Sequence, residues 1–318
     1  MNREPQSAPK TSSVHPVEIK RRMGELDIAE VSKLLREVEL ADGHAPLGEH
    51  KWLDLVHGGR KGFAGFVARE RPGGPLVGYA QLSRGHETWA VEVAVRPDHR
   101  SPSEHVGTDL LRAALEEARR LHGGHVHLWV AKPTSDSDAM AQSCGLARGR
   151  DLYQMRRALP VSDDHPRVKT RPFQPGADEE EWLEVNNRAF ASHPEQGGWT
   201  LDTILEREAE PWFDPDGFLV YESDGRLAGS CWTKVHRETD PPMGEIYVIS
   251  VDPDFKGAGL GKSLVLGGLD YLAGFGLETA MLYVDAANEV AVNLYRRLGF
   301  DVDHTDRAYT GDVTVIGS

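Results

Sequence analysis

The sequence is short of cysteine and of metal-binding spacings, and it has no long apolar run. Its 318 residues include two cysteines, Cys144 and Cys231, which are too few for a disulfide framework. No cluster of Cys and His has the spacing of a zinc site, so we expect no metal. No stretch approaches the roughly 18 consecutive apolar residues of a membrane-spanning helix, and the polar N-terminus is unlike a signal peptide. These absences predict a soluble, cytoplasmic protein without a membrane partner.

Runs of Lys and Arg are also missing. The chain has 36 basic and 50 acidic side chains, and its formal net charge is −14. Because nucleic-acid binding draws most of its affinity from neutralised phosphates, we expect no nucleic-acid partner. Two charged stretches, 116–120 and 176–182, are interpreted as solvated helix faces. We expect the chain to be a monomer.

The length predicts two domains of about 150 residues each. A Ser-, Pro- and Lys-rich segment predicts a disordered tail over 1–13, and a proline-rich stretch predicts a linker over 159–168. The expected domains are therefore 14–158 and 169–318. The two halves repeat one another, since VAVRPD begins at Val93 and ISVDPD begins at Ile249. A repeat of this length indicates a duplicated domain rather than a solenoid.

The second half has a clear alternation of elements. Two strands around a Ser-Asp-Gly turn are predicted over 217–236, and a further strand over 244–251. A helix opened by glycines follows at 259–275, then a buried strand at 280–284 and a helix at 288–299. Strands followed by alternating helix and strand predict an α/β domain.

The segment 248–263 joins a predicted strand to a predicted helix and admits three interpretations. A P-loop requires glycine where the chain has Lys256, and a dinucleotide-binding turn requires glycine where the chain has Lys262. The third pattern, Q/R-x-x-G-x-G/A with Gly259 and Gly261 as its glycines, resembles the acyl-CoA loop of the GNAT N-acetyltransferases. Backbone N–H groups at a helix N-terminus can hold a pyrophosphate. A plain glycine-rich turn that caps a helix remains the structural alternative.

The last predicted helix strengthens this resemblance. Asn288, Tyr295 and the closing Leu298-Gly299-Phe300 are arranged as in many GNAT domains, where the tyrosine lies near the thioester sulfur. Ala291, Tyr295 and Leu298 also share one helix face, so a core position is the alternative for this tyrosine.

Several longer runs are similar to the mycothiol synthase family of tandem GNAT enzymes, over roughly residues 16–310. The most specific are HPEQGGWT (193–200) and WFDPDG (212–217), with APLGEH (45–50), WTKVH (232–236) and LYVDAANEVAVNLYRRLGF (282–300). The resemblance implies two tandem GNAT-like α/β domains, each a mixed, strongly twisted sheet flanked by helices. It also implies transfer of acetyl from acetyl-CoA to the cysteinyl α-amine of cysteinyl-glucosaminyl-inositol, which gives mycothiol and CoA.

The resemblance also assigns binding residues, without any metal. Acetyl-CoA, as co-substrate, is expected along three segments of the second half: Ile249, Ser250, Val251; Lys256, Gly257, Ala258, Gly259, Leu260, Gly261, Lys262; and Asn288, Glu289, Val290, Ala291, Val292, Asn293. The sugar–cysteine substrate is expected at Glu49, Glu195, Lys234, Glu245 and Tyr283. Because Glu49 comes from the first half, we hypothesise that this substrate binds between the domains.

The first half is a degenerate copy. Val93, Ala94 and Val95 match the acetyl-CoA strand, but the loop at 99–108 keeps only Gly107, and His105 stands where a small residue is expected. We expect this half to bind acetyl-CoA weakly and to carry no chemistry.

The reaction requires an uncharged amine and a proton for the departing thiolate. A cysteinyl α-amine with a pKa near 8 is about one-tenth neutral at pH 7, so a carboxylate base acting through water suffices. Glu245 is the candidate base, with a solvated strand-edge glutamate as the alternative, and Tyr295 is the candidate acid. Two further functions remain open: acetylation of another amine, such as an aminoglycoside or a peptide N-terminus, and a non-catalytic acyl-CoA-binding regulator.

Overall fold

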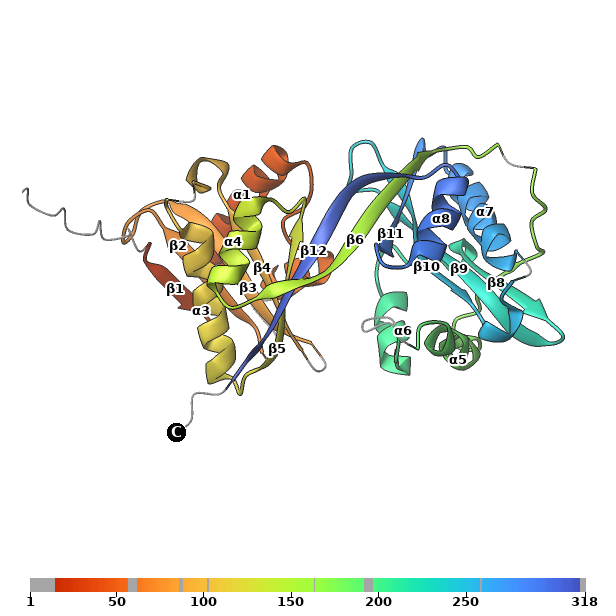
Figure 1. The fold of residues 1–318 in the computed structure, drawn as a ribbon, viewed down its shortest axis with the longest axis horizontal. Coiled ribbons are helices and arrows are strands. Elements are labelled where there is room, and N and C mark those ends of the chain that lie inside the picture. The colour runs from red at the N-terminus through yellow and green to blue at the C-terminus, as the bar shows by residue number, and fades with distance from the viewer. Residues whose placement is uncertain are drawn as a thin grey trace, which may run out of the picture. The chain divides into compact units, whose positions relative to one another are not determined.

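The computed structural model describes residues 15–56, 62–85, 88–101, 103–162, 164–191, 197–257 and 259–314, apart from the side chains of residues 49, 50 and 53. The tail expected at 1–13 lies outside the described residues. The chain forms two compact units, shown in Figure 1. Unit 1 runs to Asp151 and includes the chain from Asp306 onward, and unit 2 is Leu152–Thr305.

The unit boundaries differ from the expected domains because two strands each contribute to both units. β6 (Ala147–Ala158) pairs from Leu152 onward with β11 of unit 2, and β12 (Asp301–Val313) pairs from Asp306 onward with β5 of unit 1. The stretch 159–168 falls within unit 2 in this division, and its role as a linker stays a prediction. Strand pairing is non-local, so a proline-rich stretch between the repeats does not reveal this exchange.

Unit 1 is a mixed sheet with helices on both faces. Its strand order is β1-β2-β3-β4-β5-β12, and β4–β5 is the parallel pair. Its other elements are β1 (Val17–Lys20), α1 (Glu25–Asp42), α2 (Glu49–Val56), β2 (Ala64–Arg69), β3 (Leu76–Arg84), β4 (Thr88–Val95), the 3₁₀ turn η1 (Pro97–His99), α3 (Val106–Arg120), β5 (Gly124–Ala131) and α4 (Ser135–Ser143). Leu110 of α3 lies in one core cluster and Leu34 of α1 in another, so the sheet separates two apolar layers.

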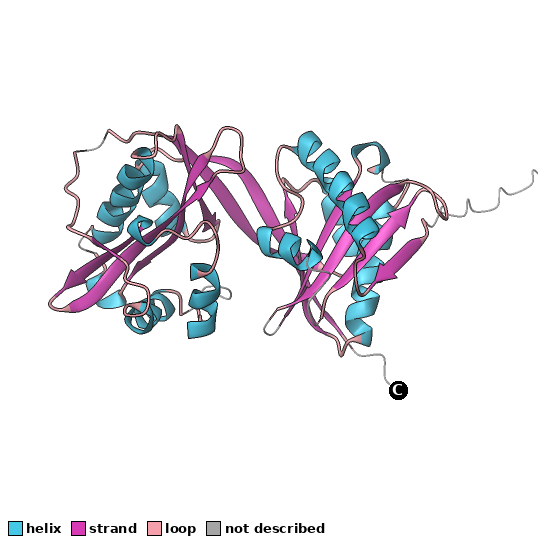
Figure 2. Ribbon diagram, turned by 180° about the vertical axis from the view of Figure 1, so that it is seen from behind, coloured by secondary structure: helices cyan, strands magenta, loops and turns pink. Residues whose placement is uncertain are grey.

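Unit 2 repeats this plan with the order β6-β11-β10-β9-β8-β7. Its other elements are β7 (Arg171–Pro172), α5 (Glu179–Ala189), α6 (Leu201–Glu208), η2 (Pro215–Gly217), β8 (Phe218–Ser223), β9 (Arg226–His236), β10 (Met243–Val251), η3 (Pro253–Phe255), α7 (Leu260–Ala273), β11 (Thr279–Asp285) and α8 (Glu289–Arg297). Helices and strands alternate along the chain as the sequence predicts, and Figure 2 shows helices packed beside the strands. The predicted fold class, a mixed sheet flanked by helices in each half, is confirmed.

The two faces of the unit 2 sheet are packed differently. The α7 and α8 face is aliphatic, with Leu264 and Leu269 fully buried. The α5 and α6 face is aromatic, and Trp232 of β9 stacks on Phe218 at 4.4 Å between ring centroids. This aromatic layer packs against the strands that carry the candidate site.

The prediction that both charged stretches are solvated is wrong for three of their carboxylates, Glu117, Asp178 and Glu179. Glu117 of α3 is 1% exposed and accepts hydrogen bonds from Arg21 Nε at 2.7 Å and Arg120 Nε at 3.0 Å. The hydrogen bond from Arg21 is the main reason why the pKa of Glu117 lies below its ordinary value. Asp178 is likewise buried and accepts from Arg171 Nη1 at 2.6 Å. Charge pairing with arginine makes this burial possible.

Among the described residues, no helix combines the length and apolar character needed to cross a membrane.

Candidate active site

The parallel strands β10 and β11 stop pairing before either strand ends. Their register runs from Gly244 opposite Ala280 to Ile246 opposite Leu282. β10 nevertheless continues to Val251 and β11 to Asp285. Within the described part of unit 2, the backbone of β10 after Ile246 and that of β11 after Leu282 are therefore not paired with each other. Strand N–H groups exposed in this way can bind an extended ligand.

A bulge accompanies the divergence. β9 pairs Thr233 with Ile246 and Trp232 with Val248, so Tyr247 is the extra residue on β10. A bulge bends its strand and increases the local twist. The acetyl-CoA residues predicted on this strand, Ile249, Ser250 and Val251, follow directly after it.

The loop between β10 and α7 is a candidate anion cradle. Gly257 has φ +94° and Gly259, the N-cap of α7, has φ +76°. Glycine adopts these values without the strain of a Cβ. The first backbone N–H groups of α7, at Leu260, Gly261 and Lys262, have no acceptor within the helix. Together with the helix dipole they form a site suited to a phosphate group. Ala258 lies outside the described residues.

Glu245 is buried, and a histidine holds its carboxylate. It is 7% exposed, and its Oε2 lies 2.7 Å from Nε2 of His236. Nδ1 of His236 lies 2.8 Å from Oε1 of Glu238. Burial by itself lowers the pKa of His236, but the hydrogen bond and charge of Glu245 and then of Glu238 raise that pKa above its ordinary value. Glu245 is therefore not the solvated strand-edge glutamate of the alternative interpretation.

Two further predicted substrate residues share the sheet face of Glu245. Lys234 is its cross-strand partner, and the Lys234 ammonium lies 4.5 Å from the ring centroid of Trp212. Tyr283 is 43% exposed, and its hydroxyl accepts a hydrogen bond from Gln154 Nε2 at 2.7 Å. The indole N–H of Trp212 is buried and has no hydrogen-bond partner among the described residues. The face thus offers a carboxylate, a cation and a hydroxyl.

α8 presents two different sides. Asn288 caps the helix, because its Oδ1 accepts from the Ala291 N–H at 3.1 Å. Val290 is 84% exposed, whereas Val292 and Tyr295 are buried in the core cluster of unit 2. Burial raises the pKa of the Tyr295 phenol, so this group stays protonated at neutral pH. Tyr295 is a core residue, as the alternative interpretation proposed, and its role as an acid stays a prediction.

The first-half counterpart of this site is built differently. β4 pairs with β5 only to Val91 and Leu128, so these strands also part. On β10, Glu245 stands one residue before the last parallel pair with β11. The matching residue on β4, one before its last parallel pair with β5, is Ala90. The N-cap of α3 is His105 at φ +58°, a left-handed conformation that is costly for a residue with a Cβ. The role predicted for Val93, Ala94 and Val95 stays a prediction.

The two remaining substrate candidates are only partly described. Glu49 is the first residue of α2, with no described side chain, and Glu195 lies outside the described residues.

Sequence reasoning missed His236, Trp212 and Gln154. His236 stands two residues from Lys234 on one strand, so the period of two could have revealed it. Gln154 comes from β6, which is placed beside β11 by the tertiary fold alone.

The matching family and the known proteins with similar sequences are all acetyltransferases. Residues 29–146 and 180–300 match the acetyltransferase (GNAT) family. The mycothiol acetyltransferase of Acidimicrobium ferrooxidans is 44% identical over 283 residues, which cover 87% of this chain and 91% of the relative. The mycothiol acetyltransferase of Thermobispora bispora is 41% identical over 291 residues, covering 89% of this chain and 95% of the relative.

Solved structures show the same fold. A GCN5-related N-acetyltransferase from Sphaerobacter thermophilus has a TM-score of 0.72 at 23% identity and covers 94% of this chain and 96% of its own. A tandem GNAT protein from the clavulanic acid biosynthesis pathway has a TM-score of 0.65 at 17% identity, covering 95% of this chain and all, 100%, of its own.

Proposed function

We propose that this chain makes mycothiol. The premise is that it belongs to the acetyltransferase (GNAT) family and is related to mycothiol acetyltransferases over most of its length. The acetyl group of acetyl-CoA is transferred to the cysteinyl α-amine of 1D-myo-inositol 2-(L-cysteinylamino)-2-deoxy-α-D-glucopyranoside, and CoA is released. The observation that carries this proposal is the gathering of Glu245, Lys234 and Tyr283 on one sheet face beside the divergence of β10 and β11.

Unit 2 holds the groups that the thioester requires. The loop ending at Gly259 and the N-terminus of α7 would bind the diphosphate of acetyl-CoA through backbone N–H groups. Lys256 and Lys262 add positive charge on either side of this loop. The open edge of β10 after Tyr247 would bind the pantetheine chain. It would also donate N–H hydrogen bonds to the thioester oxygen as negative charge develops there.

Glu245 would accept the proton of the substrate amine through a water molecule. His236 would hold the carboxylate in place through the 2.7 Å contact. Tyr295, with its pKa raised by burial, would give a proton to the departing thiolate. Orientation of the two bound reactants supplies a large share of such a rate, because it replaces a bimolecular encounter.

The polar face around Glu245 suits a sugar–cysteine substrate. Carboxylates attract the substrate ammonium and accept hydrogen bonds from hydroxyls, and Lys234 donates to sugar oxygens. The indole ring of Trp212 would contact the sugar beside Lys234. Glu49 and Glu195 are proposed as further substrate contacts on the resemblance alone.

The test is a thiol-release assay with the untagged full chain, acetyl-CoA and one amine at a time. The amines are the cysteinyl-glucosaminyl-inositol, gentamicin and a short peptide with a free N-terminus. We expect CoA release with the first amine alone, together with one acetyl-amide product by mass spectrometry. Release with gentamicin or the peptide but not with the sugar–cysteine would contradict the mycothiol assignment. Release with none of the three would favour an acyl-CoA-binding regulator.

A further inference from the structure

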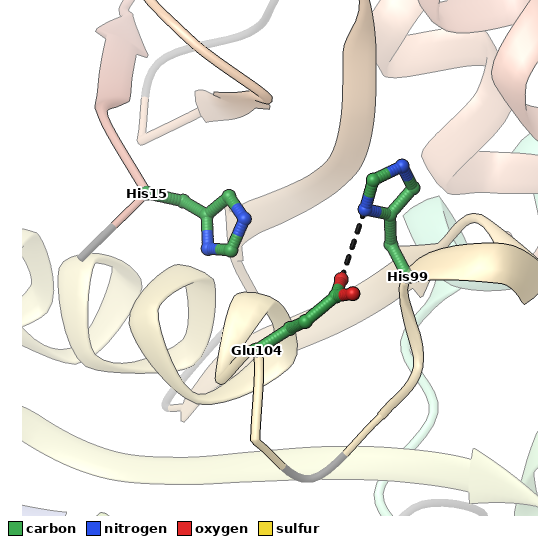
Figure 3. A group of neighbouring side chains, drawn as sticks. All are labelled: His15, His99 and Glu104. Carbon is green, nitrogen blue, oxygen red and sulfur yellow. Dashed lines mark hydrogen bonds and ion pairs between the residues drawn. The ribbon is translucent and has the colours of Figure 1, made fainter. Parts of the chain in front are cut away.

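Unit 1 carries a cluster of potential metal ligands outside the candidate active site. His15 precedes β1, His99 ends η1, and Glu104 lies just before α3. One potential ligand atom of each residue lies within 4.8 Å of the other two. Figure 3 shows the two imidazoles and the carboxylate pointing toward a common space. All three side chains are half-buried, so they are shielded but remain reachable by a small ion.

The geometry is close to that of a bound ion. Zn²⁺ binds imidazole nitrogen and carboxylate oxygen at about 2.0–2.2 Å, so two tetrahedral ligand atoms lie about 3.4 Å apart. Nδ1 of His99 and Oε2 of Glu104 are 2.9 Å apart. Small side-chain rotations would bring the third ligand from within 4.8 Å to this separation.

The two nitrogens of the His15 ring have different surroundings. Nδ1 of His15 is buried and has no hydrogen-bond partner among the described residues. In Figure 3 the other nitrogen of this ring, Nε2, faces Glu104 and His99, so Nε2 is the atom placed to bind an ion. The Asp98 carboxylate lies 3.9 Å from Nε2 of His99, on the other side of that ring. A carboxylate hydrogen-bonded behind a ligating histidine is the usual arrangement around zinc, and Asp98, which accepts from Arg96 at 2.7 Å, would have to move closer to His99 to complete it.

We propose that His15, His99 and Glu104 bind one Zn²⁺ ion, with water in the fourth position. A site of two imidazoles and one carboxylate favours Zn²⁺ over Mg²⁺ and Ca²⁺, because the latter two ions prefer oxygen ligands alone. The ion would cross-link the segment before β1 to the loop between η1 and α3. In unit 2 the corresponding loop offers glycines and backbone N–H groups suited to an anion. The loop of unit 1 instead offers donors suited to a cation.

The experiment uses the untagged full chain after treatment with a chelator and gel filtration. Co²⁺ serves as a spectroscopic probe, because a four-coordinate site gives strong visible absorption, and Zn²⁺ is then added as competitor. We expect one Co²⁺ per chain, displacement by one equivalent of Zn²⁺, and a higher unfolding temperature with zinc. Absence of the visible band, or no uptake at stoichiometric metal, overturns the proposal.

Three variants locate the ion. His99→Ala, His15→Ala and the nearly isosteric Glu104→Gln are each expected to weaken zinc binding at least about tenfold and to abolish the rise in unfolding temperature. The control is His125→Ala, which removes an exposed histidine of unit 1 that pairs with Asp312 at 2.9 Å. This control should bind zinc like the parent chain. Uptake that survives unchanged in both His99→Ala and Glu104→Gln would assign the ion to other histidines and overturn the proposal.

Discussion

Units 1 and 2 share one plan but differ where a thioester would bind. In unit 2 the N-cap of α7 is a glycine in the left-handed conformation. The preceding strand, β10, has a bulge at Tyr247 and carries the buried Glu245. In unit 1 the corresponding N-cap is His105, β4 pairs with β3 without a bulge, and Ala90 occupies the position of the carboxylate. The divergence of the parallel strands alone is common to both. The scaffold is thus retained in both copies, whereas the glycine N-cap, the bulge and the carboxylate at the position of Glu245 occur in the described part of unit 2 and not at the matching positions of unit 1.

The loop of unit 1 is also held by pairs of charged side chains, one of them with α1. Arg100 donates to both carboxylate oxygens of Asp42, at 2.6 and 2.9 Å, and His99 contacts Glu104. Such pairs occupy the polar groups that a phosphate would otherwise need. The difference teaches that a duplicated domain can keep its fold while its ligand loop acquires a different electrostatic character.

The largest expected effect tests whether chemistry belongs to unit 2 alone. Glu245→Gln should lower kcat about 100-fold, because a general base is lost while the amide keeps the shape of the side chain. The KM for acetyl-CoA should remain within about twofold, since Glu245 is not part of the proposed diphosphate cradle. Steady-state thiol-release kinetics measure both quantities. Unchanged turnover would remove Glu245 from the mechanism.

The second effect concerns the buried ion pair of unit 1. Glu117→Gln should lower the unfolding free energy by about 2 kcal/mol at pH 7, because two arginines lose a charged acceptor. The pKa of Glu117 is depressed in the folded state, so its contribution is full above the ordinary value of 4.5 and disappears as the pH falls through the folded pKa.

Urea unfolding at pH 7 and pH 3 measures this difference. The matched control is Glu116→Gln on the same helix, whose exposed carboxylate pairs with Arg119 at 3.1 Å and should contribute less than about 0.5 kcal/mol. Equal losses for the two variants would show that burial of Glu117 adds nothing.

The third effect tests the glycine turn. Gly259→Ala should raise the Kd for acetyl-CoA about tenfold, because a Cβ at φ +76° strains the N-cap by about 1–2 kcal/mol and re-aims the first N–H groups of α7. Isothermal titration gives the affinity. Gly43→Ala is the control, since Gly43 has φ +70° and open space around it but lies at the end of α1 in unit 1. A similar loss of affinity in the control would mean that general destabilisation, not the cradle, is responsible.

The smallest expected effect is a shift in titration. NMR of the His236 ring should show a pKa above the ordinary 6.5, and Glu245→Gln should move it back down, because the accepting charge is lost. Folding therefore favours the protonated ring. This stabilisation is full below the ordinary pKa and is lost as the pH rises through the folded value. Glu238→Gln should produce a smaller shift in the same direction, and an unmoved pKa in Glu245→Gln would argue against coupling of the pair.

Much of unit 2 could be predicted from local patterns. The strands at 218–223 and 226–236, the helix beginning after Gly259 and the N-cap at Asn288 all follow from alternation, glycine placement and capping preference. Burial of Glu117 could not be predicted in this way. Its arginine partner Arg21 is 96 residues away, and the pattern around Glu117 looks like any exposed helix face.

The sequence by itself determined the class of fold, the duplication and the likeness to acetyltransferases, because strand alternation, glycine turns and long shared runs are local properties. Only the tertiary structure decided which groups meet. The order of strands in the sheet brings Gln154 to Tyr283, exchanges the last strands of the two units, and sets His15 beside His99 and Glu104. These juxtapositions depend on pairing between segments far apart in the chain, and no periodicity within a single segment encodes them.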